Sequence, residues 1–475
     1  MTALSLFIGL LTFLGFLLFE FIRPPAGIPP LRLRGYDFFA AFLLAGNLVQ
    51  FYLFLTRRSD GLAVLEEGLS IGNISALIWT SAAACYLAYV FLTGRFRILW
   101  LFCTPYSSIF LLIAVYFTTT LWSITFSYTL YRGIELIVWI SLAVYFFTRL
   151  ESNIDKVMFL AVYCIIWCLM DIQLLFENLS NGIVFSAIKE NILPAVAFSV
   201  IVFGWSTRLR AIFCFIGVLT FIFAGSAASF ASAIAVCFVA LVFDRSMGLK
   251  LVGYVGALFS FVLFVTFLIV PDQFPDAVEL LSYILQKPPT ELLAATGRYR
   301  IWEIFWTATQ NQYFGSGFCT DRFIQLIAGL GEASVAFESD TINIYSAHNA
   351  ILAAWVSAGW PGVVALLFAN ATGIHFCAKF GGKYRASTTM TLAFIALNSL
   401  TIPGLGGYYS ASWLVWIAAL SIAGSQYRAQ VTQPGTLFRR ISRLGFIPER
   451  PLPLGAKGSR EAVGNNFPPS AQPQF

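Results

Sequence analysis

Charged residues are scarce in this chain, and so are histidines. Only 11% of the 475 residues are Asp, Glu, Lys or Arg, whereas about a quarter are charged in soluble domains, and 59% are hydrophobic. Water cannot solvate most of such a surface. The composition therefore excludes a soluble globular domain and favours helices surrounded by lipid, for which 48 Phe and 12 Trp are well suited.

Several motifs of metal and nucleotide chemistry are also absent. The sequence has no Asp-X-Asp pair, no His-rich metal-ligand spacing and no Walker glycine loop. Metal-dependent transfer and nucleotide hydrolysis therefore lack a site, and we expect no metal and no cofactor. The cysteines lie mostly in apolar runs and indicate no disulfide framework.

What the chain does have is a series of apolar runs. A helix needs about 20 apolar residues to cross the hydrocarbon core, and barrel strands would alternate, which these runs do not. We therefore predict an all-α polytopic membrane protein with about 13 (12–14) transmembrane helices. The predicted spans are 2–22, 36–56, 74–93, 99–119, 131–148, 157–176, 190–206, 210–224, 227–243, 250–270, 351–373, 386–402 and 409–425.

The cations lie in small clusters between these runs. Every odd-numbered span is followed by a basic loop and the even loops are poorer, with Arg57 and Arg58 as the exception. Short cytoplasmic loops are enriched in Lys and Arg, so the N-terminus is predicted outside and the C-terminus in the cytoplasm. The net charge of +6 therefore reflects the cations of the cytoplasmic loops, and we expect no nucleic-acid partner.

One connection is far longer than the rest, and it divides the chain. Residues 1–270 are predicted to form the N-terminal transmembrane helices, 271–350 a large outer loop, and 351–428 the C-terminal transmembrane helices. Loops of this length usually carry function. The stretch 429–475 is basic and then rich in Pro, Ser, Asn and Gln, which predicts a disordered cytoplasmic tail.

Two histidines and an arginine pair are the candidates for chemistry. His348 lies in SAHNA, where the outer loop meets the next span, and a neutral imidazole there could accept a proton. His375 lies at the cytoplasmic end of a span and is interpreted as an interfacial residue. An ordinary structural role is the alternative for an isolated His348.

Arg298 and Arg300 lie in TGRYRIWEIFW, inside a predicted helical stretch, 290–306, of the outer loop. A guanidinium fork suits phosphate oxygens, so an outward arginine could hold a lipid pyrophosphate. Residues two apart on a helix point in different directions, so only one of the two is expected to be central. The alternative is an ordinary solvated or ion-paired arginine.

The order of these features resembles the bacterial O-antigen ligase and polymerase family. That family has a Gly-Arg followed by a Trp, a Gly-X-Gly soon after, and a His-Asn that opens the next span with glycines behind it. The matching segments are GRYRIWEIFWTATQNQYFGSGF and SAHNAILAAWVSAGWPGVVALL. The positions on the pattern are Arg298, Trp302, Gly315, Gly317, His348, Asn349, Gly359 and Gly362.

The resemblance implies a GT-C-like fold with a large helical periplasmic loop, and a metal-independent glycosyltransferase in the bacterial inner membrane. The implied donor is a glycan on undecaprenyl diphosphate, used on the periplasmic side. His348 matches the family's general base and Arg298 its diphosphate-holding arginine. Trp302, Asn349 and the nearby cations Arg300 and Arg322 are expected to bind substrate.

One departure concerns a second arginine. The family usually has a Ser-Arg at the outer end of an earlier span, where this chain has Gly225, Ser226 and Ala227. The second diphosphate contact is then missing or is supplied from elsewhere, with Arg300 and Arg322 as the candidates.

Two functions share this chemistry. The leading hypothesis is a polysaccharide polymerase that joins lipid-linked repeat units of an O-antigen, capsule or exopolysaccharide. The alternative is a ligase that transfers the glycan to lipid A core. A non-catalytic lipid-glycan transporter is the alternative of another class. Membrane lipids, a flippase and a chain-length regulator are the other partners that the polymerase hypothesis implies.

Overall fold

The computed structural model is helical throughout the part of the chain that it describes, which confirms the predicted all-α class. The predicted spans 2–22, 190–206 and 210–224, most of 157–176 and nearly all of the tail 429–475 lie outside the described residues. The count of about 13 spans therefore stays a prediction. The described residues are 35–56, 71–94, 105–150, 152–153, 155–157, 159–160, 163, 227–243, 246–269, 275–276, 278–279, 298–324, 327, 347–401, 404–407 and 410–431.

Three of the described helices are long and apolar enough to cross a membrane. They are α4 (Ile71–Leu92) over Ile74–Leu92, α6 (Phe126–Arg149) and α16 (Ala350–Phe380). Shorter apolar stretches lie in α2 (Gly35–Thr56), in α5 (Ser107–Thr118) with the following η2 (Thr119–Trp122), and in α11 (Met247–Ile269). Together these elements support a multi-pass membrane protein.

Most described helices begin within three residues of the predicted spans, but α5 begins at Ser107, well inside the predicted 99–119, and α6 departs in the other direction. It begins at Phe126, five residues before the predicted 131–148. The Oγ of Ser123 accepts the N–H of Thr125 at 3.1 Å, which closes the turn between η2 and α6 after only a few residues. Arg132, which lies at the very start of the predicted span, is therefore well inside the helix.

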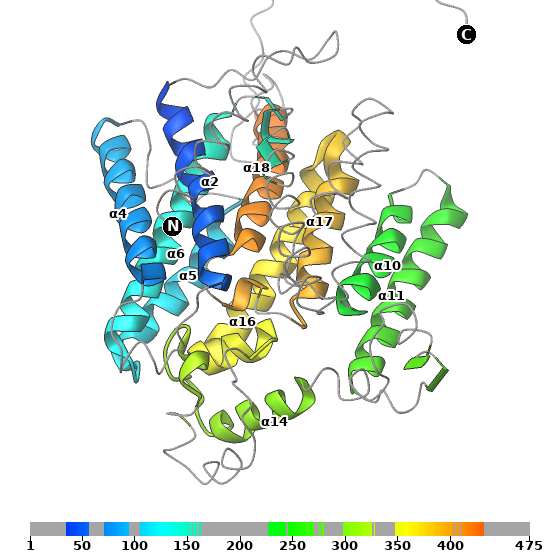
Figure 1. Cartoon of the computed structure of the whole chain (residues 1–475). Helices are drawn as coiled ribbons and strands as arrows, with labels where there is room; N and C mark the ends of the chain where they lie inside the picture. The colour runs from blue at the N-terminus through cyan, green and yellow to red at the C-terminus, as the bar shows by residue number, and fades with distance from the viewer. Residues whose placement is uncertain are drawn as a thin grey trace, which may run out of the picture. The chain divides into compact units, whose positions relative to one another are not determined.

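The helices α2, α4 and α6 pack together (Figure 1). Asp37 in the first turn of α2 pairs with Arg149 at the end of α6, with 3.6 Å between Oδ1 and Nε. The start of α2 and the end of α6 therefore lie on the same side of the membrane, as the predicted alternation requires. Most of α6 is buried by its neighbours, whereas most of α4 is not, so α4 presents its remaining surface to lipid.

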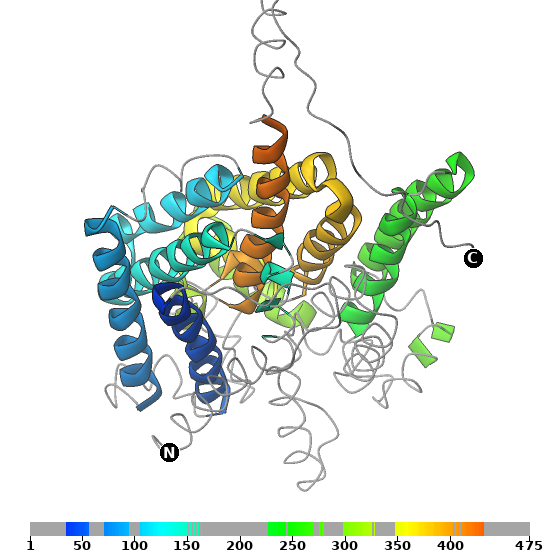
Figure 2. The ribbon, with the colours of Figure 1, turned by 90° about the horizontal axis from the view of Figure 1, so that it is seen from above.

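The C-terminal helices fill the centre of this arrangement. Figure 2 shows α18 (Ala411–Val431) surrounded by other helices, and its Trp413 and Trp416 are completely buried. The hydroxyl of Ser421 donates to the Phe147 carbonyl of α6 at 3.0 Å. The connection between α16 and α17 (Arg385–Asn398) is the short η7 (Gly382–Tyr384), and η8 (Gly404–Gly406) follows α17. A buried core therefore joins the two halves of the chain.

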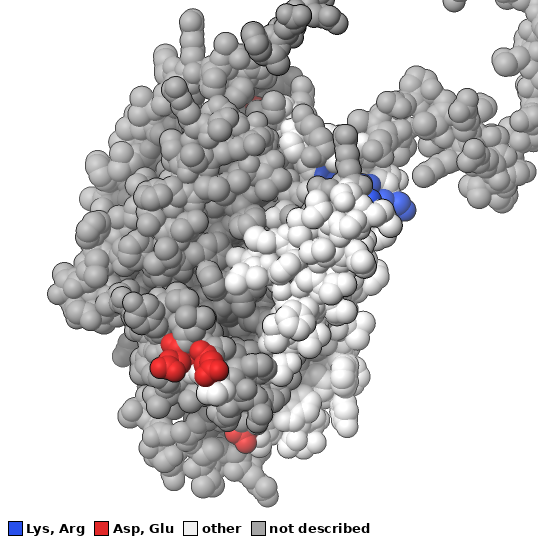
Figure 3. All heavy atoms as spheres, turned by 90° about the vertical axis from the view of Figure 1, so that its right-hand side faces the viewer, with Lys and Arg blue, Asp and Glu red and all other residues white. Residues whose placement is uncertain are grey.

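The hairpin of α10 (Ala227–Leu241) and α11 packs on α17 and leaves a broad apolar surface. Leu251, Val255 and Leu258 on α11 are each more than half exposed, as lipid-facing residues would be. Figure 3 shows this side of the molecule, where Lys and Arg gather at one end of an uncharged surface and Asp and Glu at the other. An apolar band with charges at its two ends is what a membrane-spanning pair requires.

Candidate active site

A turn at the end of α14 (Arg298–Thr309) connects the outer loop to both halves of the membrane domain. The N–H of Ser316 donates to the Val356 carbonyl of α16 at 2.7 Å, and the Ser316 carbonyl accepts the N–H of Ile124 at 3.0 Å. The hydroxyl of Thr129 on α6 donates to the Phe318 carbonyl at 3.2 Å. These contacts hold the turn between the start of α6 and the first part of α16.

The glycines of the sequence pattern permit this close approach. Gly315 and Gly317 have φ of +71° and +120°, and Gly359 in α16 has φ of +61°, a backbone that disfavours side chains. A Cβ on Gly359 would lie 1.8 Å from the Tyr313 carbonyl oxygen. That carbonyl instead accepts the N–H of Trp360 at 3.0 Å. The pattern glycines are therefore explained by the kink of α16 against the turn.

His348 lies immediately before α16, in a backbone conformation that is uncommon for a residue with a side chain. Its φ is +47°, and its side chain is half-buried. The next residue, Asn349, is the N-cap of α16, and its Oδ1 accepts the N–H of Ile351 at 2.8 Å and of Leu352 at 3.0 Å. Its Nδ2 donates to the Leu400 carbonyl at 3.0 Å. Asn349, predicted to bind substrate, thus has a capping role that fixes the backbone next to His348.

A buried carboxylate is bonded to the residue that precedes His348. Asp321, in η5 (Thr320–Phe323), is only 7% exposed. Its Oδ2 accepts the N–H of Ala347 at 3.4 Å, a long hydrogen bond. The beginning and the end of the segment 321–347 are thereby brought together at the residue before His348.

Arg298 and Arg300 lie on different faces of α14. Arg298 shares a helical face with Trp302, Phe305 and Thr309, and the last two are completely buried. Arg300 instead shares a face with the exposed Glu303. The indole Nε1 of Trp302 is buried without a hydrogen-bond partner in the structure. Position 298 therefore lies on the packed face of α14, beside an indole donor that a ligand oxygen could satisfy.

The remaining residues of the prediction are Arg322, the pair Gly225 and Ser226, and His375. The backbone of Arg322 lies in η5 beside Asp321, whereas Gly225 and Ser226 lie outside the described residues. His375 is exposed near the far end of α16, roughly 35–40 Å along the helix from its start. Across the described ranges, no three His, Cys, Asp or Glu residues are grouped as metal ligands would be.

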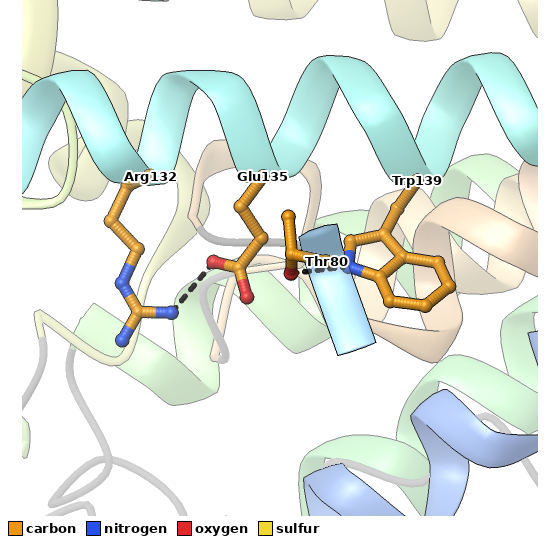
Figure 4. Close-up of polar contacts among 4 residues, drawn as sticks. All are labelled: Thr80, Arg132, Glu135 and Trp139. Atoms are coloured by element: carbon orange, nitrogen blue, oxygen red, sulfur yellow. Dashed lines mark hydrogen bonds and ion pairs between the residues drawn. The ribbon is translucent and has the colours of Figure 1, made fainter. Parts of the chain in front are cut away.

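A buried ion pair lies in α6 close to the same turn. Arg132 Nη1 and Glu135 Oε2 are 2.7 Å apart, and both side chains are almost fully buried (Figure 4). The Arg132 guanidinium lies 5.2 Å from the Tyr128 ring, and that ring packs against Phe323 of η5 at 5.0 Å. One turn further along the same side of α6, the Trp139 indole reaches Thr80 of α4 (Figure 4). The pair thus supports the part of α6 on which η5 rests.

A comparison with known protein families finds a match for the segment that contains most of these residues. Residues 212–367 match the family model described as O-antigen ligase. The chain contains an O-antigen ligase family domain. No curated protein matches the chain. The match confirms the predicted family, and this O-antigen ligase domain includes α14, the turn, His348 and the kinked first part of α16. The helices α5 and α6, on which the domain rests, lie before the matched segment.

Sequence reasoning missed three residues near this site. Asp321 was only one of many charged residues in the outer loop, and no spacing along the chain connects it to Ala347. Arg132 and Glu135 fall inside the predicted span 131–148, and its hydrophobic pattern does not indicate that they pair. Their spacing of three would have placed them on one helical face, which was the available signal.

Proposed function

We propose that this membrane protein transfers a glycan from undecaprenyl diphosphate to a sugar hydroxyl, without a metal, on the periplasmic side of the inner membrane. The observation that carries the proposal is the position of His348 inside an O-antigen ligase family domain. It lies where the outer loop enters α16, between a capping Asn349 and a residue bonded to Asp321.

In the proposed reaction His348 is the general base. The imidazole takes the proton of the acceptor hydroxyl as that oxygen attacks the anomeric carbon of the donor sugar. The bond between this carbon and the diphosphate oxygen breaks, and undecaprenyl diphosphate leaves with the additional negative charge. A guanidinium at position 298 stabilises that charge. The lipid diphosphate already activates the sugar, so no nucleotide is required.

The remaining predicted residues have supporting roles in this proposal. The indole Nε1 of Trp302 donates a hydrogen bond to an oxygen of the lipid-linked substrate. Arg300 and Arg322 contribute positive charge near its diphosphate. Asn349 acts through the backbone, because both ends of its amide are bonded to main-chain groups. It is therefore proposed to orient His348.

The acceptor distinguishes two enzymes. A polymerase uses the sugar of another lipid-linked repeat unit, of an O-antigen, capsule or exopolysaccharide, and would work with a flippase and a chain-length regulator. A ligase uses a sugar of lipid A core. The ligase fits at least as well as the polymerase, because the matching family model is described as O-antigen ligase. The two share donor, base and leaving group.

The test is turnover by the purified full-length protein with a lipid-linked repeat unit, in the presence and absence of lipid A core. A ladder of longer glycans without lipid A core supports the polymerase, and a product that contains lipid A core supports the ligase. Turnover should survive addition of EDTA. A protein that binds the lipid-linked glycan but forms no product in either mixture would favour the transporter and exclude the proposed transfer.

A further inference from the structure

Asp321 connects two parts of the outer loop directly beside the proposed base. It lies in η5, which packs through Phe323 on the Tyr128 ring of α6. Its carboxylate is buried and accepts the N–H of Ala347, 26 residues further along the chain. Burial of a carboxylate is costly unless hydrogen bonds or charges compensate it, so a buried acidic side chain at this position has to be explained.

The backbone of His348 provides the second observation. A left-handed φ of +47° is uncommon for a residue with a side chain, and such a conformation is usually held by its surroundings. The surroundings here are Asp321 on the N–H before His348 and the Asn349 cap after it. Asp321 and Asn349 thus fix the backbone on both sides of His348. Of the two side chains, only Asp321 carries a formal negative charge.

We propose that Asp321 is the positioning residue for His348. It holds the backbone that carries the imidazole, and its negative charge stabilises the imidazolium that forms when His348 accepts the proton of the acceptor hydroxyl. The proton stays on the imidazole, and the carboxylate remains ionised throughout. A base that is oriented and electrostatically supported by a third group is a general arrangement in acid–base catalysis. This inference rests on the proposed transferase function.

Other titratable groups also face this carboxylate or its turn. Tyr116 of α5 interacts electrostatically with Asp321 and with Cys319 of the same turn. Arg132 and Tyr128 of α6 interact with each other, and Arg132 also interacts with Cys319. Of these groups, only Arg132 carries a formal charge at neutral pH. It already forms an ion pair with Glu135, so its charge is compensated within α6.

The experiment compares purified full-length variants in the turnover assay, as a function of pH. Asp321→Asn keeps the shape and an acceptor for Ala347 but removes the charge. It should lower kcat by at least about tenfold, with the KM for the lipid-linked donor changed less than about twofold. Without the carboxylate the imidazole holds its proton less tightly, so the midpoint of the acid limb should move to lower pH. Asp321→Glu should retain more activity than Asp321→Asn.

Asp276→Asn is the matched control, because this carboxylate belongs to the same outer loop and is exposed. Wild-type kcat and an unmoved acid limb in Asp321→Asn, with His348→Ala inactive, would overturn the inference and leave the proposed function intact. Failure of the wild-type protein to turn over any lipid-linked glycan would instead remove the proposed function. If Asp321→Asn does not accumulate, Asp321→Ser decides, because it also removes the charge and keeps an oxygen acceptor, and an unchanged kcat and acid limb in that variant would overturn the inference.

Discussion

At the scale of single residues, His348 is the side chain on which the proposed chemistry depends. A positioned general base typically contributes about a hundred- to ten-thousandfold in rate, so His348→Ala should lose at least about a hundredfold in turnover. The variant should still insert and accumulate, because the Asn349 cap of α16 is unchanged. Glycan transfer per milligram of purified protein is the measurement.

His375→Ala is the internal control for this change, because His375 is exposed near the opposite end of α16. It should be nearly silent. Retention of more than about a tenth of the wild-type rate in His348→Ala would show that another group takes the proton, since this exceeds what loss of a base allows.

The two arginines of α14 should differ in their tolerance of lysine. Lysine keeps the charge but loses the bidentate fork, so Arg298→Lys should reduce product yield clearly, whereas Arg300→Lys should be milder. The reason is the position of each residue, since Arg298 shares the face of buried Phe305 and Arg300 that of exposed Glu303. Product yield in a deletion strain, at matched protein level, is the measurement. Equal tolerance of the two changes would place the diphosphate away from Arg298.

At the scale of elements, α6 illustrates what the apolar pattern misses. The prediction began this span at 131, with Arg132 and Glu135 close to its start, but the helix begins at Phe126. Each charge is compensated by the other within the helix, which a hydropathy pattern does not register. The polar start of α6 is also bonded to a turn almost 200 residues away, through Thr129 and Phe318.

Breaking this pair should be costly, whereas replacing both members should not be. Glu135→Leu leaves the Arg132 guanidinium buried without its carboxylate, and loss of one partner of a buried pair costs about 3–5 kcal/mol. Arg132→Leu combined with Glu135→Leu should recover most of that loss in the free energy of unfolding. The measurement is denaturant unfolding in detergent, followed by tryptophan fluorescence.

Glu303→Gln on the exposed side of α14 is the control for this pair and should change stability by less than about 0.5 kcal/mol. A double variant that is no more stable than Glu135→Leu alone would mean that Arg132 is held chiefly by its aromatic neighbours. In that case the loss would come from removing Glu135 itself.

At the scale of the whole molecule, the predicted topology can be tested at described positions. Gln310, at the end of α14, is expected on the outer side, and Lys379, at the far end of α16, in the cytoplasm. A membrane-impermeant thiol reagent should label Gln310→Cys in intact spheroplasts, and should label Lys379→Cys only after the membrane is opened. Each variant is compared with the parent protein, because the chain has native cysteines. Labelling of Lys379→Cys from outside would reverse the predicted orientation.

Composition and local pattern alone determined that this protein is helical and membrane-bound, because the lipid solvent requires long apolar helices whatever their neighbours are. The O-antigen ligase family could also be recognised from the sequence, because the Arg, Gly and His-Asn motifs keep their order along the chain. The site depended on contacts that no local pattern encodes. Only the tertiary structure brought Asp321 to Ala347 and seated the glycine turn between α6 and α16, because these bonds join segments that are far apart in the chain.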